Sequence, residues 1–408
     1  MTSRLARLTH LGVFSQIGDA SAFYGLMAAV LPVTVAAMLL TTVRNTFAAE
    51  NFLGAQGVGN VAIATTVGGG VAGMFASSLG DRYSAKRIVI IINLAFAVTT
   101  FALWLLLQQQ GVTSFAFLAI AVVDGGMIAV SVSAVAKVQA HLVSRDAKGA
   151  AEAVSSIRSS IGSLLGIAFV LWVGRGTNAL LWASALFVLV SLLVALVTRN
   201  LEVQPHSRVS RSGSSAVFVR AIRENRELRD IMIADSVMFL ALPTALLSLG
   251  VVAENILELN PLLTSAGIVG VLAGRLLVGV RGTEVRVPRA LRTATLLYAC
   301  LALGSWFLLK DDWLLGQALL MTVIATVASA AGSFVQSMLG AKLQEQLPED
   351  VRSRGTGLMY GVHSVELTIG VALATWVVTG WSLHEYLLIL GMGLLLAAIG
   401  LRGFSRIR

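Results

Sequence analysis

The feature that most constrains this chain is a series of apolar runs, each about 20 residues long, kept apart by short charged gaps. A helix of that length rises about 30 Å, which matches the hydrocarbon thickness of a bilayer. Twelve runs have this character, centred near Ala28, Val67, Ala95, Val123, Leu165, Phe187, Leu242, Val271, Leu301, Val327, Leu373 and Leu394. The first run, from Leu11 to Leu40, is longer than one span and contains Pro32. The chain is therefore predicted to be an all-α membrane protein with twelve transmembrane helices.

The distribution of charge predicts the orientation. Only 12% of the residues are charged, about half the share of a soluble protein. The net charge is +9, and 25 of the 30 basic residues fall on one face if the N-terminus lies inside. Basic residues mark the cytoplasmic side, so we expect both termini in the cytoplasm and a multi-pass location in the cell's inner (plasma) membrane. The outer loops are expected to keep only Arg44, Arg175 and Lys310. Topology explains the positive excess, so no nucleic-acid partner is expected.

Several chemical functions lack the motifs that they need. The single cysteine, Cys300, excludes a disulfide framework, and no His-Glu-x-x-His is present, so neither a metal nor a cofactor is expected. Without a Gly-x-x-x-x-Gly-Lys-Ser/Thr loop, the chain is not expected to hydrolyse ATP or to be an enzyme. The glycines at 57–62 match a dinucleotide pattern but open an apolar helix. Together with Gly68-Gly69-Gly70 and Gly73, they are predicted to let the second helix approach a neighbour closely.

Short sequences recur at about half the chain length. Ala136-Lys137-Val138-Gln139 returns as Ala341-Lys342-Leu343-Gln344. Two more pairs follow in the same order: Asp19 with Asp235 in the first and seventh helices, and Arg158 with Glu366 in the fifth and eleventh. An internal repeat of this kind indicates a duplicated helix bundle, which is the usual build of secondary transporters.

The repeat and one polar stretch predict the domain organisation. Residues 202–215 are rich in Ser and Arg and have the composition of a tether. We predict an N-terminal six-helix bundle over residues 1–200, a cytoplasmic linker over 201–228 and a C-terminal six-helix bundle over 229–408.

A family resemblance rests on the loop between the second and third helices, Leu79-Gly80-Asp81-Arg82-Tyr83-Ser84-Ala85-Lys86-Arg87. It resembles the loop signature of the major facilitator superfamily, Gly-x-Leu-x-Asp-Arg-x-Gly-Arg-Lys/Arg. Leu79, Asp81, Arg82 and Lys86 match, and Arg87 extends the basic end. The spacing from the Gly-Asp pair in the first helix is similar to that of bacterial exporters in the family. The resemblance implies the major facilitator fold, with two pseudo-symmetric six-helix bundles.

The resemblance also implies a conformational latch formed by Asp81, Arg82, Lys86 and Arg87. In the family, the aspartate faces the positive N-terminal end of helix 11 and holds the cytoplasmic side shut. A carboxylate at a helix N-terminus contributes about 1–2 kcal/mol in partly buried geometry, which is enough to bias a two-state carrier. The alternative is that the basic residues only set topology. A tight turn between the two helices is expected in either case.

Ionisable residues inside apolar runs are costly and are functional candidates by default. Glu366 lies about nine residues into the eleventh helix, roughly 14 Å from its inner end and close to the midplane, where transporter sites lie. A carboxyl in a low-dielectric cavity can bind a proton near neutral pH, and a nearby arginine opposes that binding. We therefore expect Glu366, Arg158 and Asp19 to couple transport to protons. The alternative is a static ion pair between helices.

A second set is expected to line the substrate cavity: Gln16, Phe23, Tyr24, Asp124, Asp235, Tyr360 and His363. His363 is either a proton relay or a neutral hydrogen-bond donor. Asp124, which precedes Gly125-Gly126, is either a cation site or a hydrogen-bond acceptor in helix packing. The alternative for the aromatic members is plain helix packing.

These features predict a secondary active transporter that works by alternating access. Its expected partners are a small-molecule substrate, protons and the lipid bilayer, and it is expected to be a monomer. The preferred hypothesis is proton-coupled export, by antiport, of a small amphipathic or cationic molecule, because carboxylates dominate the intramembrane candidates. Uptake of a metabolite, nutrient or chelate is the alternative. A non-transporting sensor or lipid scramblase is a further alternative, although the loops are too short to hold a sensor domain.

Overall fold

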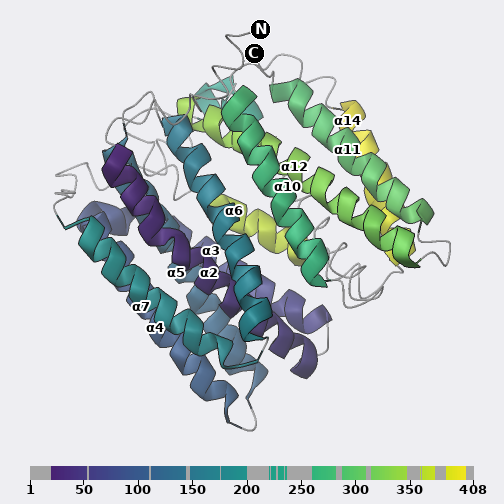
Figure 1. Cartoon of the computed structure of the whole chain (residues 1–408). Helices are drawn as coiled ribbons and strands as arrows, with labels where there is room; N and C mark the ends of the chain where they lie inside the picture. The colour runs from purple at the N-terminus through teal and green to yellow at the C-terminus, as the bar shows by residue number, and fades with distance from the viewer. Residues whose placement is uncertain are drawn as a thin grey trace, which may run out of the picture. The chain divides into compact units, whose positions relative to one another are not determined.

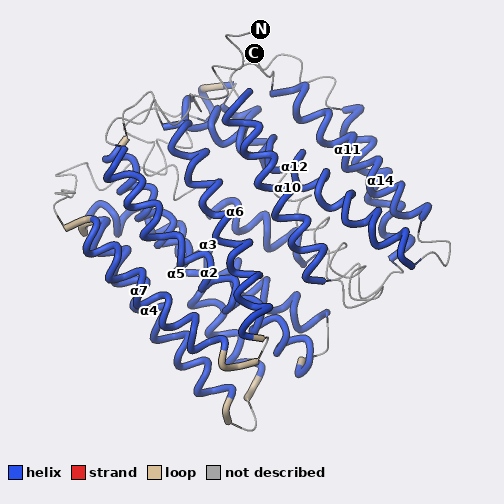
Figure 2. The backbone as a smooth tube through the Cα atoms, viewed as in Figure 1, coloured by secondary structure: helices blue, strands red, loops and turns tan. Residues whose placement is uncertain are grey.

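The structure is a computed structural model, and every element that it describes is a helix (Figure 2). The described residues are 20–52, 55–109, 112–143, 148–174, 176–199, 260–281, 287–308, 314–346, 361–372 and 383–400, with Met359 and most of 220–236. The predictions for Gln16, Asp19 and Tyr360 lie outside these residues, as do those for the side chains of Asp81 and Arg82.

Long helices follow one another along the chain (Figure 1). The first half contains α2 (Ala20–Asn51), α3 (Ala55–Arg82), α4 (Ala85–Leu107), α5 (Ser114–Leu142), α6 (Lys148–Val173) and α7 (Ala179–Val197). The second half contains α10 (Asn260–Arg281), α11 (Val287–Leu308), α12 (Leu314–Gln346) and α14 (Leu383–Gly400), and residues 361–372 are also helical. Each labelled helix contains one predicted span centre. The centres near Leu242 and Leu373 lie outside the described residues.

The length and hydropathy of these helices suit a bilayer. Within the described part of the chain, seven helices are long and apolar enough to cross a membrane, namely those of α2 to α7 and α12. Shorter apolar stretches lie in α10, α11 and α14. Large apolar side chains also project outward: Val98, Leu192 and Leu196 are 68%, 64% and 66% exposed. An apolar exterior on apolar helices is what a multi-pass membrane protein needs.

Contacts divide the chain into two compact units. The first unit comprises Val13–Glu224 together with Leu347–Thr368, so the helical residues 361–368 belong with α2 to α7. The second unit contains α10, α11, α12 and α14.

In the first unit, α4 and α7 pack closely. Phe96 of α4 stacks on Phe187 of α7 with ring centroids 4.9 Å apart, and both side chains are buried. Ser184 of α7 donates its hydroxyl to the backbone oxygen of Ala97 at 2.8 Å. Because lipid offers no hydrogen-bond partner, such a bond satisfies the hydroxyl while it holds the helices together.

The helices α3 and α5 cross in backbone contact. A Cβ added at Gly68 would overlap the carbonyl oxygen of Val122, and one at Gly125 would overlap that of Thr65. Only small residues permit this approach. The prediction that Gly68 belongs to a close packing surface is therefore confirmed.

The second unit contains a similar crossing between α10 and α12. A Cβ at Gly274 would overlap the carbonyl oxygen of Ala330. The sequence repeat relates Ala136 to Ala341, which lie 205 residues apart. The same separation relates Gly125 at the first crossing to Ala330 at the second. The repeat is therefore present in the helix packing as well as in the sequence.

A tight turn joins α3 to α4. The helix α3 ends at Arg82 and α4 begins at Ala85, so Tyr83 and Ser84 form the whole connection. The N–H of Tyr83 donates to the carbonyl oxygen of Leu79 at 3.0 Å. The turn that the sequence predicts at this position is confirmed.

Candidate functional site

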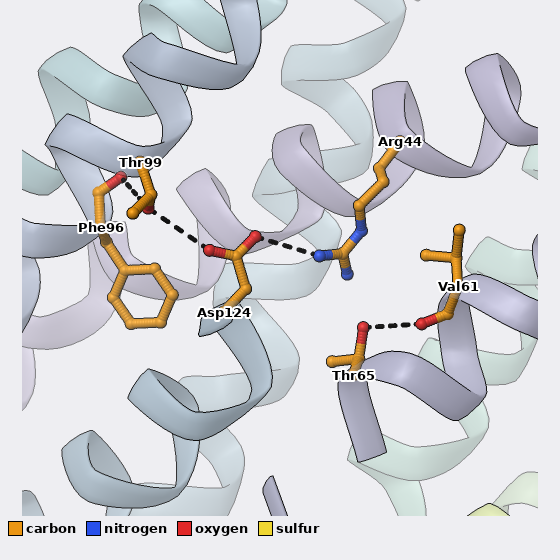
Figure 3. Close-up of polar contacts among 6 residues, drawn as sticks. All are labelled: Arg44, Val61, Thr65, Phe96, Thr99 and Asp124. Atoms are coloured by element: carbon orange, nitrogen blue, oxygen red, sulfur yellow. Dashed lines mark hydrogen bonds and ion pairs between the residues drawn. The ribbon is translucent and has the colours of Figure 1, made fainter. Parts of the chain in front are cut away.

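A buried ion pair joins α2 to α5 in the first unit (Figure 3). Arg44 Nη1 donates to Asp124 Oδ2 at 3.1 Å. Thr99 of α4 donates its hydroxyl to the other carboxylate oxygen, Oδ1, at 3.3 Å. Arg44 is 5% exposed and Asp124 is 1% exposed. Both oxygens of a buried carboxylate thus have donors, which come from two different helices.

The surroundings of this ion pair are apolar and tightly packed. Asp124 precedes Gly125, the residue at the crossing of α3 and α5. Nearby, Thr65 donates its hydroxyl to the carbonyl oxygen of Val61 within its own helix at 2.9 Å (Figure 3). One buried hydrophobic cluster contains Val43, Ala48, Val61, Ala64, Phe96, Ala121 and Met127. In such a medium, each charge is tolerated because the other compensates it.

The prediction that Arg44 lies in an outer loop is wrong. It follows from ending the first apolar run at Leu40, whereas α2 continues to Asn51 and keeps Arg44 inside the helix. A buried arginine is costly by itself, but Asp124 neutralises it. For Asp124, the sequence leaves open a cation site or an acceptor role in helix packing. Its contacts with Arg44 and Thr99 are those of a packing acceptor.

Arg158 connects α6 to α2. Its Nη1 donates to the carbonyl oxygen of Val30 at 3.1 Å, and its Nε donates to that of Ser155 at 3.5 Å. The side chain is half-buried. Val30 lies two residues before Pro32, so the guanidinium sits at the turn where α2 contains its proline.

Glu366 lies on the helical residues 361–372 and is 9% exposed. His363 on the same helix is half-buried. The helix packs against α3, where the hydroxyls of Thr368 and Thr66 are hydrogen-bonded at 2.7 Å. Glu366 is thus a buried carboxyl in the same compact unit as Arg158. Their predicted partnership in proton coupling stays a prediction.

The remaining cavity candidates lie in different surroundings. Phe23 is fully buried in the apolar core of the first unit and meets Tyr24 edge to face, with ring centroids 5.5 Å apart. Its place is that of a packing residue, the alternative that the sequence leaves open. Tyr24 is half-buried, and Asp235 in the second unit is 2% exposed.

The predicted latch residues Lys86 and Arg87 differ in their contacts. Lys86 Nζ donates to the carbonyl oxygen of Thr198 at 3.3 Å, directly after the end of α7 at Val197. A cation at a helix C-terminus satisfies an open carbonyl and is favoured by the helix dipole. Arg87 is exposed. The capping role of Lys86 has no signal in the sequence, because its partner is 112 residues away.

Solved structures that are similar to the chain include a nucleoside transporter, a fucose:proton symporter and an organic anion transporter. The nucleoside transporter NupG has a TM-score of 0.69 and 13% identity, covering 95% of this chain and 100% of its own. The E. coli fucose:proton symporter FucP has a TM-score of 0.66 and 17% identity, with coverages of 94% and 98%. The human organic anion transporter MFSD10 (TETRAN) has a TM-score of 0.64 and 15% identity, with the same coverages. At these identities, the likeness concerns the fold alone.

The sequence comparisons give the family. No curated protein sequence matches the chain. The model of the Major Facilitator Superfamily matches residues 20–326, from the start of α2 into α12. Because this match spans most of the sequence, the chain belongs to the Major Facilitator Superfamily and has its all-helical membrane fold.

Proposed function

We propose that the protein is a secondary active transporter that couples the movement of a small molecule to protons by alternating access. The observation that carries the proposal is a buried carboxyl, Glu366, on a helix of a transporter fold. Ionisable residues at membrane depth are expensive and mark ion or substrate pathways. Asp124 is also buried, but Arg44 matches its charge at 3.1 Å. Glu366 also lies close to the expected midplane, where transporter sites are found. It is our choice for the residue that carries the proton, with Arg158 and Asp19 as its partners.

For the cargo and direction, we propose export of a small amphipathic or cationic molecule. The spacing between the Gly-Asp pair of the first helix and the loop from Leu79 to Arg87 is similar to that of bacterial exporters, which supports this direction. The carboxylates Asp19, Asp235 and Glu366 support a cationic cargo. Asp124 no longer contributes to that argument, since its ion pair with Arg44 has no net charge.

Uptake of a polar metabolite is the second candidate. It is favoured by the solved structures with the same fold, one of which is a nucleoside transporter and another a fucose:proton symporter. Symport and antiport use the same fold and differ in the side on which substrate accumulates. A flux measurement with an imposed pH gradient separates them.

The test is flux into proteoliposomes with a pH difference of one unit and the membrane potential clamped by potassium and valinomycin. Ethidium and tetraphenylphosphonium serve as cationic probes, and uridine and fucose as polar ones. Proton antiport is expected to concentrate a cation on the acidic side by up to about tenfold, because one pH unit is worth about 1.4 kcal/mol per proton. Accumulation of uridine or fucose on the alkaline side would establish uptake instead. A flux that does not depend on the pH gradient would contradict proton coupling.

We further propose the orientation and organisation that the charges and the repeat predict. Both termini lie in the cytoplasm, the protein resides in the plasma membrane, and a monomer is the functional unit. On the sequence repeat, the proposed bundles span residues 1–200 and 229–408, joined by the linker 201–228, although contacts group the helical residues 361–368 with α2 to α7.

Asp81→Asn is expected to shift the carrier toward its inward-open state. The substitution removes the charge that we propose as the latch, and about 1–2 kcal/mol corresponds to a population change of roughly 5- to 30-fold. Spin-label distances across the cytoplasmic face measure the shift. Glu224→Gln is the control, since Glu224 is an exposed carboxylate in an ion pair with Arg220. Unchanged distances and unchanged flux in Asp81→Asn would reduce the loop to a topology signal.

A further inference from the structure

Pro32 creates a gap in the backbone hydrogen bonding of α2. It lies inside the helix Ala20–Asn51 and has no N–H to donate to the carbonyl oxygen of Ala28. Its ring also displaces the preceding turn, and the disturbed carbonyls need donors that lipid does not supply. Side chains of neighbouring helices commonly fill this need.

Arg158 binds in this turn, although not at the carbonyl of Ala28, which is the one that loses its N–H partner. Its guanidinium crosses from α6 and donates to the carbonyl oxygen of Val30 at 3.1 Å, within the turn that precedes Pro32. Val30 itself is 1% exposed, so water has little access to this carbonyl. A hydrogen bond from a charged donor to a buried carbonyl is stronger than a neutral one.

The helix α6 follows α2 past the proline at intervals of one turn. A Cβ at Gly162 would lie 2.7 Å from Cβ of Thr34, and one at Gly166 would lie 2.6 Å from Cβ of Met38. These backbone-close contacts fix the part of α2 that follows Pro32. Before Pro32, α6 contacts α2 through the hydrogen bond from Arg158 to Val30. Because Arg158 has a long side chain, this bond can form or break without a movement of α6.

We infer that Arg158 is a positioning residue that clamps the proline turn of α2. While the guanidinium holds Val30, the residues before Pro32 stay aligned with those after it. When the guanidinium leaves, the N-terminal part of α2 bends about Pro32, whereas Arg44 and Asp124 keep the C-terminal part on α5. This inference deepens the proposed function by giving Arg158 a mechanical target, but its test measures geometry and needs no substrate.

Spin labels on either side of Pro32 test the clamp in the full chain, with Cys300 replaced by serine. Labels at Ser21 and Val98 report on the N-terminal part of α2, since both positions are exposed. Arg158→Gln is expected to move Ser21 by about 5 Å, the result of a 20° kink over roughly 16 Å of helix. A second pair, Glu50 and Val98, reports on the part after Pro32 and is expected to stay unchanged. Arg158→Lys keeps a cationic donor and should preserve most of the original distance.

The decisive control combines Pro32→Ala with Arg158→Gln. Alanine at position 32 restores the N–H that donates to the carbonyl oxygen of Ala28 and so removes the hinge. The double variant should therefore keep the Ser21–Val98 distance of Pro32→Ala alone. An equal movement with and without the proline would overturn the inference, as would an unchanged distance in Arg158→Gln. If Arg158→Gln fails to fold, the double variant still decides. Its folding supports the clamp, and its failure beside a folded Pro32→Ala protein refutes it.

Discussion

Replacing Asp124 with asparagine is expected to lower the free energy of unfolding by about 3–5 kcal/mol, the usual cost of removing one partner from a buried ion pair. The cost arises because the guanidinium of Arg44, which is 5% exposed, would keep its charge without the carboxylate that now lies 3.1 Å away. Asparagine fills nearly the same space and can still accept from Thr99, so packing changes little. Thermal unfolding of the detergent-solubilised protein measures the loss.

Two further variants make this result specific. Glu224→Gln breaks an ion pair with Arg220 at 2.9 Å whose side chains are 76% and 66% exposed, and exposed pairs contribute at most about 1 kcal/mol. Arg44→Met combined with Asp124→Asn removes both charges, and it should recover most of the stability because no lone charge is left buried. An Asp124→Asn protein as stable as the wild type would show that the pair does not hold α2 to α5.

Arg44 shows why part of the site escapes sequence reasoning. Hydropathy treats a charged residue near the end of an apolar run as the beginning of a loop. That rule fails when a partner elsewhere in the chain removes the cost of burial, and Asp124 is 80 residues away. The capping of α7 by Lys86 is hidden for the same reason. A pair formed only by tertiary packing leaves no periodic pattern in either helix.

The features that the sequence does predict are local or periodic. Apolar runs of membrane length predict the helices, and the Arg82–Ala85 junction has the expected tight turn. Gly68 is expected to permit a close approach, although the sequence does not identify Val122 of α5 as its neighbour. The second crossing, at Ala330, is not predicted from the sequence, although the 205-residue offset of the repeat relates Ala330 to Gly125 of the first crossing. Local chemistry therefore predicts which surfaces are suited to contact, whereas the choice of partner depends on the assembled bundle.

Glu366→Gln is expected to abolish accumulation driven by a pH gradient while leaving exchange of substrate intact. Glutamine has nearly the shape of a protonated glutamate, so it holds the side chain permanently in the state that we assign to the proton-bound carrier. With a pH difference of one unit, the wild type is expected to accumulate its probe by up to about tenfold. The variant should reach equal concentrations on both sides, because its cycle no longer moves a proton.

Comparing net accumulation with exchange distinguishes a loss of proton coupling from a general loss of transport. Exchange of labelled for unlabelled probe needs the substrate site and the rocking motion but no net proton movement, so a folded Glu366→Gln protein should retain it. Glu224→Gln, an exposed carboxylate changed in the same way, should keep both activities. Full pH-driven accumulation by Glu366→Gln would eliminate Glu366 as the carrier and pass the role to Asp19. A variant that does not fold would instead favour a structural ion pair at this position, since breaking a buried pair costs stability before it affects transport.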